Sequence, residues 1–502
     1  MINSRLFSQA FPEPEKSLEI EKYKFLSIGF ASQSYKSPVS FFGHTFLVTH
    51  NQPKPELESV AIEFVGDISR ENGIFSALLS SVEGYYNYRR FYDKLREYNL
   101  EDRGVWTYRI KISEQEKIAL SKLILKKNHL KERYSFIRKN CAYKIYDLIQ
   151  EPLSLSKKWT DSLFVTLPIQ TLKRKDLLAR IEESYYFPSH QELLSKAFNE
   201  LDAEQRKVIK KYPLNAFSIQ ATSRLDTKQK RVIEKAIDYK MLNETNENNI
   251  EHYFKLKKEL FSSSYYKNTD AFENPQNPIN TNKEQYVSLS NIFSRKTHSQ
   301  SLAIQFFQRD FLSTLNDSSR DNYLEGLKPE MTFSKSSLRL SRFTLFKIQN
   351  TFEKEYVTNG SVKLFDISYY DRTWTSSSST KSYDLKLGFG YAVKLANFKF
   401  ALIPHFALRY LTELKSSETD SFGKWNPKFH TGLKLYMSTF INNQTRIKTE
   451  LDTDSLSSFK NSLRLTTDAV VYDGSMGAVL LGHRYLLKSH LNELKFTYAY
   501  FF

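Results

Sequence analysis

The sequence predicts an α+β domain, a helical middle region and a C-terminal antiparallel β-barrel that spans a membrane. Residues 1–185 mix short apolar runs with helical patterns, and residues 186–285 are polar with mostly helical periodicity. Residues 286–502 contain long segments in which apolar side chains alternate with polar or small ones, as in strands with two different faces. A chain of 502 residues accommodates about two to four domains.

In the first region, three strands and a helix stand out. Residues 41–48 and 59–67 are apolar runs separated by the turn-rich NQPKPE, and residues 104–112 form another run. Ser113 and Glu116 have the spacing of a capping box, in which two side chains cover free backbone N–H groups at a helix start. We therefore expect strands and helices to alternate in this region.

The middle region reads as a helical spacer or a lid. Ser189 and Glu192 repeat the capping-box spacing directly after Pro188. Three more segments of helical periodicity follow them. Residues 268–285 are rich in Asn and Pro and have the composition of a linker.

The third region predicts a barrel because its strands are long. Apolar residues occupy every second position from Tyr383 to Leu395, and residues 398–410 repeat the alternation after a short link. Soluble strands are usually about 5–6 residues long. An open sheet edge is unstable in lipid, so such strands close into a barrel, here of about 10–12 strands. The alternative is a large soluble β-sandwich.

Three local signals refine this prediction. The alternation changes phase within residues 337–346, which indicates a β-bulge or a strand boundary. Asp473-Gly474 is a hairpin-turn dipeptide. The last strand ends on the aromatic Phe502, which resembles the terminal signal of bacterial outer-membrane barrels.

Composition narrows the partners and the compartment. The net charge of +17 favours anionic partners, and the basic stretch 122–144 is suited to anionic lipid headgroups or is a solvated helix surface. A single cysteine excludes an intrachain disulfide and a Cys-rich metal site, and we expect neither metal nor cofactor. No apolar run reaches the length of a membrane-spanning helix. The first residues lack the apolar core of a secretory signal, although a barrel in the outer membrane of a Gram-negative bacterium requires export.

The single cysteine, Cys141, has two interpretations. It follows Asn140, a good helix N-cap, and shares one helix face with Ile145, Leu148 and Ile149, as a buried core residue would. A thiol in the first turn of a helix also has a lowered pKa, which favours a nucleophilic thiolate. His44, on a predicted strand next to a glycine, is the best candidate for its base.

Three motifs in order resemble one known family. SFFGHTFLV (40–48), DRGVWTYRIKISEQEK (102–117) and YSFIRKNCAYKIYDLI (134–149) resemble the periplasmic-domain family typified by Lnb, a lipoprotein intramolecular transacylase. The resemblance covers roughly residues 25–150 specifically and the rest of the chain weakly. That family is similar to circularly permuted papain-like folds, which include NlpC-type peptidases. It therefore implies a permuted papain-like domain with His before Cys in the chain.

The resemblance also implies site residues. Cys141 would be the nucleophile and His44 its base, with Glu63, on the next predicted strand, as the group that accepts the second imidazole proton; Asp67 is a weaker alternative. We expect Asn140, Arg103 and Ser40 to support the substrate or the oxyanion. Each also has a structural interpretation: Asn140 as a helix cap, Arg103 as an ion-pair partner, and Ser40 as part of a turn.

The function implied is that of a cysteine-dependent acyltransferase or acyl hydrolase. It would act on lipid or lipoprotein acyl esters through a thioester, at the periplasmic face of the outer membrane. Two alternatives stay open: an NlpC-like peptidase or amidase on peptidoglycan, and a non-enzymatic barrel with a periplasmic binding domain. No nucleic-acid recognition motif accompanies the positive charge, so we expect no nucleic-acid partner.

Overall fold

The chain divides into two compact units, Met1–Ile279 and Asn280–Phe502, which are described separately. The fold comes from a computed structural model. It describes residues 20–32, 34, 40, 43–67, 81–128, 130–136, 138–156, 166–211, 214, 224–262, 274–275, 277–281, 285–294, 298–309, 323–334, 337–352, 361–371, 380–395, 398–413, 426–440, 445–453, 463–472, 477–486 and 491–501.

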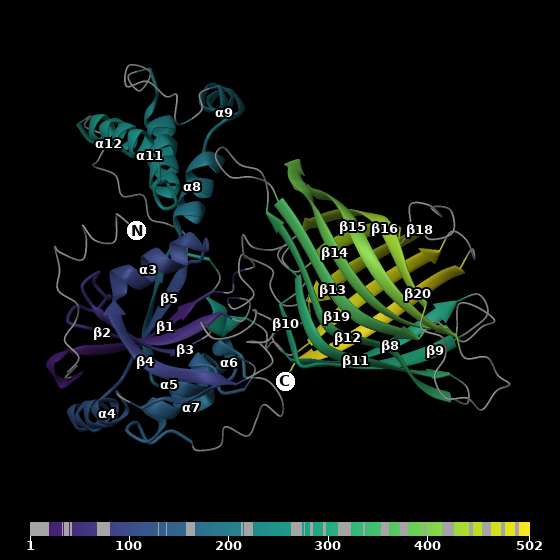
Figure 1. Cartoon of the computed structure of the whole chain (residues 1–502), viewed down its shortest axis with the longest axis horizontal. Coiled ribbons are helices and arrows are strands. Elements are labelled where there is room, and N and C mark those ends of the chain that lie inside the picture. Colours follow the sequence, from purple (N-terminus) through teal and green to yellow (C-terminus); the bar gives the residue numbers. More distant parts are fainter. Residues whose placement is uncertain are drawn as a thin grey trace. The chain divides into compact units, whose positions relative to one another are not determined.

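The first unit is built on a seven-stranded sheet in the order β6-β4-β3-β2-β1-β5-β7, in which all neighbours run antiparallel (Figure 1). Its strands are β1 (Phe25–Ala31), β2 (His44–His50), β3 (Val60–Gly66), β4 (Val82–Arg90), β5 (Val105–Ile110), β6 (Glu132–Tyr134) and β7 (Ile181–Phe187). The central strands β1, β2 and β3 are buried along nearly their whole length, because helices and loops cover the sheet.

Short helices and one 3-10 turn accompany the sheet: η1 (Ile20–Lys22), α3 (Phe91–Leu100), α4 (Glu114–Lys127), α5 (Cys141–Gln150), α6 (Pro168–Leu172) and α7 (Lys175–Leu178). The capping box expected at Ser113 and Glu116 begins α4. Helix α5 packs on β2 and β3, so its first turn meets the middle of the sheet.

The expected helices of the middle region are present. They are α8 (His190–Asn199), which the Ser189–Glu192 capping box begins, α9 (Ala203–Lys210), α11 (Thr227–Met241) and α12 (Glu247–Ser262). A 3-10 turn, η5 (Pro278–Asn280), follows. Within the described part of the chain, no helix has both the length and the apolar character needed to cross a membrane.

The second unit is a closed antiparallel barrel (Figure 1). Among the described residues, 12 strands form the ring, from β8 and β9 through β11 to β20, and the ring closes by pairing β20 with β8 and β9 with β11. The strands are β8 (Tyr286–Ser294), β9 (His298–Gln305), the short β10 (Phe307–Arg309), β11 (Tyr323–Ser334), β12 (Ser337–Phe352), β13 (Ser361–Asp371), β14 (Thr380–Leu395), β15 (Phe398–Glu413), β16 (Asn426–Phe440), β17 (Thr445–Thr453), β18 (Leu463–Tyr472), β19 (Gly477–Leu486) and β20 (Leu491–Phe501).

The two faces of the barrel strands differ as the sequence predicted. On β14, Leu387, Phe389 and Tyr391 are exposed, whereas Asp384 and Lys386 are buried. Because alternate side chains of a strand point to opposite faces, the barrel has an apolar outer surface and a polar interior. This is the arrangement of a barrel that crosses an outer membrane, and it argues against a soluble sandwich, whose apolar face is inside.

The phase change within residues 337–346 is a bulge. Strand β12 shifts register against β11 near Ser341 and against β13 at Leu345. Each shift leaves one residue of β12 without a paired partner residue, which moves the alternation by one position. The predicted Asp473-Gly474 turn and the terminal Phe502 lie outside the described residues.

Candidate active site

Cys141 is the first residue of α5 and is buried at 2% exposure. It lies at the helix N-terminus, where N–H groups without a partner inside the helix concentrate positive charge. The backbone N–H groups of Thr45 and Ala142 donate to its sulfur. The helix therefore supplies both the position of the thiol and part of its electrostatic environment.

His44 begins β2, and its imidazole is the acid–base group beside the Cys141 sulfur. Gly43, directly before it, has a φ of 83°, a conformation that glycine adopts readily and other residues rarely do. The turn at Gly43 fixes where the imidazole enters the site. The ring is 18% exposed and packs beside Phe46 and Tyr98, and it forms a hydrogen bond with the Cys141 side chain.

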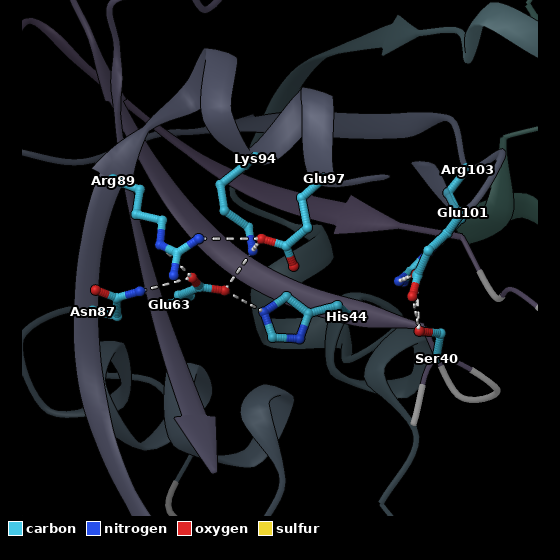
Figure 2. A network of polar contacts seen from close by, with 9 residues as sticks. All are labelled: Ser40, His44, Glu63, Asn87, Arg89, Lys94, Glu97, Glu101 and Arg103. Carbon is cyan, nitrogen blue, oxygen red and sulfur yellow. Dashed lines mark hydrogen bonds and ion pairs between the residues drawn. The ribbon is translucent and has the colours of Figure 1, made fainter. Parts of the chain in front are cut away.

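Glu63, on β3, is the carboxylate that contacts His44. Its Oε2 lies 3.2 Å from Nε2 of His44, which leaves Nδ1 as the ring nitrogen for the thiol. Lys94 Nζ approaches the same oxygen at 2.8 Å, and Asn87 Nδ2 donates to Oε1 at 3.2 Å. Figure 2 shows these side chains converging from β2, β3, β4 and α3. Asp67 lies just beyond the end of β3, and its N–H donates to the carbonyl of Glu83.

The charges of the three groups support one another. Burial lowers the pKa of His44, but the neighbouring Cys141 and Glu63 outweigh it and raise that pKa to about 9. Burial raises the pKa of the Cys141 thiol, and His44 together with the two backbone N–H groups brings it below its ordinary value. The pKa of Glu63 is likewise held well below its usual range, against its burial, first by Lys94 and then by His44. All three shifts favour the charged forms, a thiolate and an imidazolium beside a carboxylate.

The N–H groups of the first turn of α5 are already engaged. The N–H of Cys141 donates to the hydroxyl of Tyr134, and that of Ala142 to the sulfur. The N–H of Tyr143 donates to Asn140 Oδ1 at 3.2 Å, and that of Lys144 to the Asn140 carbonyl. A substrate oxyanion would therefore meet Tyr134 or displace one of these bonds.

Asn140 acts through the backbone. Its Oδ1 caps α5, and its Nδ2 donates to the carbonyls of Phe136 at 3.2 Å and Thr166 at 2.6 Å. Both ends of the amide are occupied, which fits the structural interpretation of this residue as a helix cap.

Arg103 and Ser40 belong to a second network, separate from the first in Figure 2. Arg103 is buried and contacts Glu101 at 2.7 Å, and it donates to the carbonyls of Ser32 and Ala31. Ser40 Oγ lies 2.8 Å from both carboxylate oxygens of Glu101. The structure thus joins Cys141, His44 and Glu63, and it places Arg103 and Ser40 around Glu101 instead.

Three basic side chains of the stretch 122–144 are paired with acidic residues of the same unit. Lys127 pairs with Asp147 at 3.0 Å, Lys131 pairs with Glu83 at 2.9 Å, and the buried Lys144 pairs with Glu132. On α4, Lys122 and Lys126 are exposed beside the exposed apolar residues Ile118 and Leu125. Accessible positive charge lies on this face of α4 and also at Arg133, Arg138 and Lys139, which are exposed as well.

Sequence reasoning missed Lys94 and Asn87. Asn87 lies directly opposite Glu63 in the β3–β4 pairing, a register that the sequence does not reveal. The position of Lys94 could have been predicted, because Phe91, Lys94 and Tyr98 have the spacing of one helix face. In the structure all three are buried. A lysine within an apolar stripe predicts a buried acidic partner.

Comparisons with solved structures concern the barrel. Three are the KdgM porin in complex with disordered oligogalacturonate (10% identity, TM-score 0.26, 43% of this chain and 99% of that one), the NanC porin (9%, 0.26, 43% and 98%) and the outer membrane protein Omp33 of Acinetobacter baumannii (7%, 0.23, 44% and 98%). A search of curated protein sequences gave no match.

The comparison with family models concerns the first unit. Residues 13–175 match the model of the Lnb N-terminal periplasmic domain. The match includes all three sequence motifs and every residue of the Cys141–His44–Glu63 site. Residues 13–175 therefore carry an Lnb-type N-terminal periplasmic domain, the family that the motifs predicted.

Proposed function

We propose that the first unit is a cysteine-dependent acyltransferase or acyl hydrolase. It acts on acyl esters of lipids or lipoproteins, through a thioester on Cys141, at the periplasmic face of the outer membrane. The observation that carries the proposal is the contact chain from Cys141 through His44 to Glu63. Its members have the roles of nucleophile, acid–base group and orienting carboxylate.

The first half-reaction forms the thioester. The Cys141 thiolate attacks the ester carbonyl and a tetrahedral oxyanion forms. When the oxyanion collapses, the carbon–oxygen bond to the leaving alcohol breaks, and the His44 imidazolium gives its proton to the departing oxygen. The products are the acyl-thioester, a free alcohol and a neutral imidazole, which Glu63 keeps oriented through Nε2.

The second half-reaction reverses the proton transfer. An amine, a hydroxyl group or water attacks the thioester carbonyl, and neutral His44 accepts its proton. The carbon–sulfur bond then breaks and the thiolate leaves, which restores the thiolate–imidazolium pair. The identity of the acceptor decides between transfer and hydrolysis.

Tyr134 is our candidate donor to the oxyanion. Its hydroxyl accepts the N–H of Cys141, so it lies next to the attacking residue and retains its own proton to donate. Asn140 is not available for this role, because its amide is bound to backbone groups.

Two features favour a lipid-linked substrate. The second unit is a barrel with an apolar outer face, so the chain is held at a membrane, where acyl esters are concentrated. The exposed face of α4 combines Ile118 and Leu125 with Lys122 and Lys126, a composition that suits an anionic lipid surface.

The test uses the full chain in detergent with a long-chain fluorogenic ester. Wild type should release the alcohol and accumulate an acyl group on Cys141, seen as a hydroxylamine-sensitive mass increase. C141S and H44A should do neither. H50Q is the matched control, because His50 ends the same strand and hydrogen-bonds Ser27 instead. Cleavage of peptidoglycan peptides without ester turnover would instead support the peptidase alternative, and no Cys141 adduct with any acyl donor would refute the proposal.

A further inference from the structure

Lys94 is a lysine in an unusual place. It lies on α3 with its side chain only 2% exposed. A buried ammonium is strongly unfavourable unless it is paired, and lysine is among the residues least often fully buried. None of the motifs around Cys141 and His44 includes it, so its position needs its own explanation.

Lys94 is held by two carboxylates, one of which belongs to the site. Nζ lies 2.8 Å from Glu63 Oε2 and 2.8 Å from Glu97 Oε2, and it stands 4.8 Å from the centre of the Tyr98 ring. Figure 2 shows Lys94 and His44 meeting the same carboxylate from two sides. The oxygen that orients His44 is therefore also held by a fixed cation.

We propose that Lys94 is a positioning residue, which keeps Glu63 ionised and aimed at His44 and so sets the lower pH limit of the thiolate–imidazolium pair. This inference rests on the proposed function. Lys94 touches neither the sulfur nor the reacting carbonyl in this account, and it acts through Glu63 alone.

The surroundings of Glu63 single out Lys94. The charged and titratable groups that face Glu63 are His44 from β2, Arg89 from β4, Lys94 and Tyr98 from α3, and, on the far side of His44, Tyr134 and Cys141. Glu97, also on α3, contacts both Lys94 and Arg89 and is about half-exposed. Arg89 Nε is 3.9 Å from Glu63 Oε1 and the Arg89 side chain is half-exposed, so solvent screens its charge. Lys94 is closer and buried, and it is the largest influence that holds the pKa of Glu63 down against burial.

Removing the cation has a defined sign. Without Lys94, burial of Glu63 is opposed mainly by His44, so the pKa of Glu63 rises. Once Glu63 is protonated, the imidazolium loses its carboxylate and the pKa of the Cys141 thiol rises toward its ordinary value. The thiolate then disappears at a higher pH than in the wild type.

The experiment measures the rate at which a small methanethiosulfonate reacts with the protein as a function of pH. The chain has one cysteine, so the full-length protein reports on Cys141 alone. The variants are K94M, K94R as the charge-retaining rescue, and R89M as the matched control that removes the screened cation. E63Q and E63Q/K94M test whether Lys94 acts through Glu63.

We expect the acid limb of the K94M profile to lie about one pH unit or more above that of wild type, with K94R and R89M close to wild type. E63Q and E63Q/K94M should have superimposable profiles. An unshifted limb in K94M, or an additional shift from K94M in the E63Q background, would overturn the inference. If K94M alone does not fold, the profiles of E63Q and E63Q/K94M are still compared, because the double variant removes both buried charges. A difference between them would still overturn the inference.

Failure of the inference and failure of the proposed function give different results. If wild type has no thiolate-like reactivity below pH 8 and H44A changes nothing, the dyad itself is wrong. If H44A abolishes that reactivity and K94M leaves the profile unchanged, only the role of Lys94 is wrong.

Discussion

The protonation state of His44 is central to the chemistry proposed for the first unit. It stands between two groups that favour its charged form, the Cys141 sulfur and the Glu63 carboxylate, and its own burial is too weak an opposing effect. A histidine that stays protonated through neutral pH is suited to donate a proton to a leaving group. It can act as a base only after that proton has been given away.

Turnover should therefore fall at alkaline pH. The proton that His44 donates is present below its pKa of about 9 and is lost as the pH rises through that value. We expect ester turnover to decline above about pH 9 while methanethiosulfonate labelling of Cys141 continues, because the thiolate persists. Parallel pH profiles of the two reactions check this. A decline of both together would point to unfolding.

Tyr134 offers a second test at this scale. Y134F removes the hydroxyl that accepts the Cys141 N–H but keeps the ring, which packs against Phe64 and Phe136. If that hydroxyl binds the oxyanion, turnover should drop by about a hundredfold, while thiol labelling changes little. F136L, which alters the neighbouring ring without removing a donor, serves as the control. Equal losses in both variants would indicate a packing role.

Cys141 and His44 could be predicted from the sequence because each lies in a short, distinctive motif. A glycine precedes the histidine, and an asparagine that caps a helix precedes the cysteine. Glu63 followed from its place on the next strand. Asn87 could not be found this way, because its contact depends on the register between β3 and β4. The same limit applied to Arg103, whose buried contact with Glu101 depends on how the loop after α3 folds back.

Among the elements, the barrel strands follow most directly from sequence. Apolar residues at every second position over more than ten residues predict a strand of a membrane-spanning barrel. The change of phase in β12 predicted its bulge. The sheet of the first unit was harder to predict. Its central strands are buried on both faces and show no alternation of apolar and polar residues. The sequence pattern therefore predicted neither the strand order nor the pairing of β5 with β7.

The outer face of β14 allows a direct test of membrane insertion. Phe389 is 65% exposed in the isolated chain and, in our account, faces lipid. F389K should destabilise the inserted barrel by about 2–4 kcal/mol if this position lies near the bilayer midplane. F389L keeps the apolar surface and should be close to neutral. Unfolding in lipid vesicles measures both, and equal stability of the two variants would contradict a lipid-facing Phe389.

At the scale of the whole molecule, the interior of the barrel is bridged. Lys434 on β16 donates to Gln349 on β12 at 2.8 Å, and Lys495 on β20 lies 3.0 Å from Glu330 on β11. In each pair the two strands are not neighbours in the sheet, so these contacts cross the interior. An interior tied together in this way is suited to anchoring and poorly suited to passing solutes.

We therefore expect the purified protein to carry no steady current in planar bilayers. K434A/K495A, which removes both bridges, should conduct, and K363A on β13, where the side chain is exposed, should behave as wild type. Single-channel recording checks this. A wild-type conductance like that of an open pore would refute the anchor interpretation.

The seam of the barrel also determines the order in which the molecule can mature. Ser290 on β8 and Thr497 on β20 share a hydrogen bond although they are 207 positions apart in the chain. Synthesis proceeds from the N-terminus, so β8 is made long before β20, the strand that closes the ring. Until that strand arrives, β8 and β19 are open edges that lipid does not tolerate. Insertion therefore requires the complete chain, and any chaperone that escorts it has to shield the barrel strands until β20 can pair with β8.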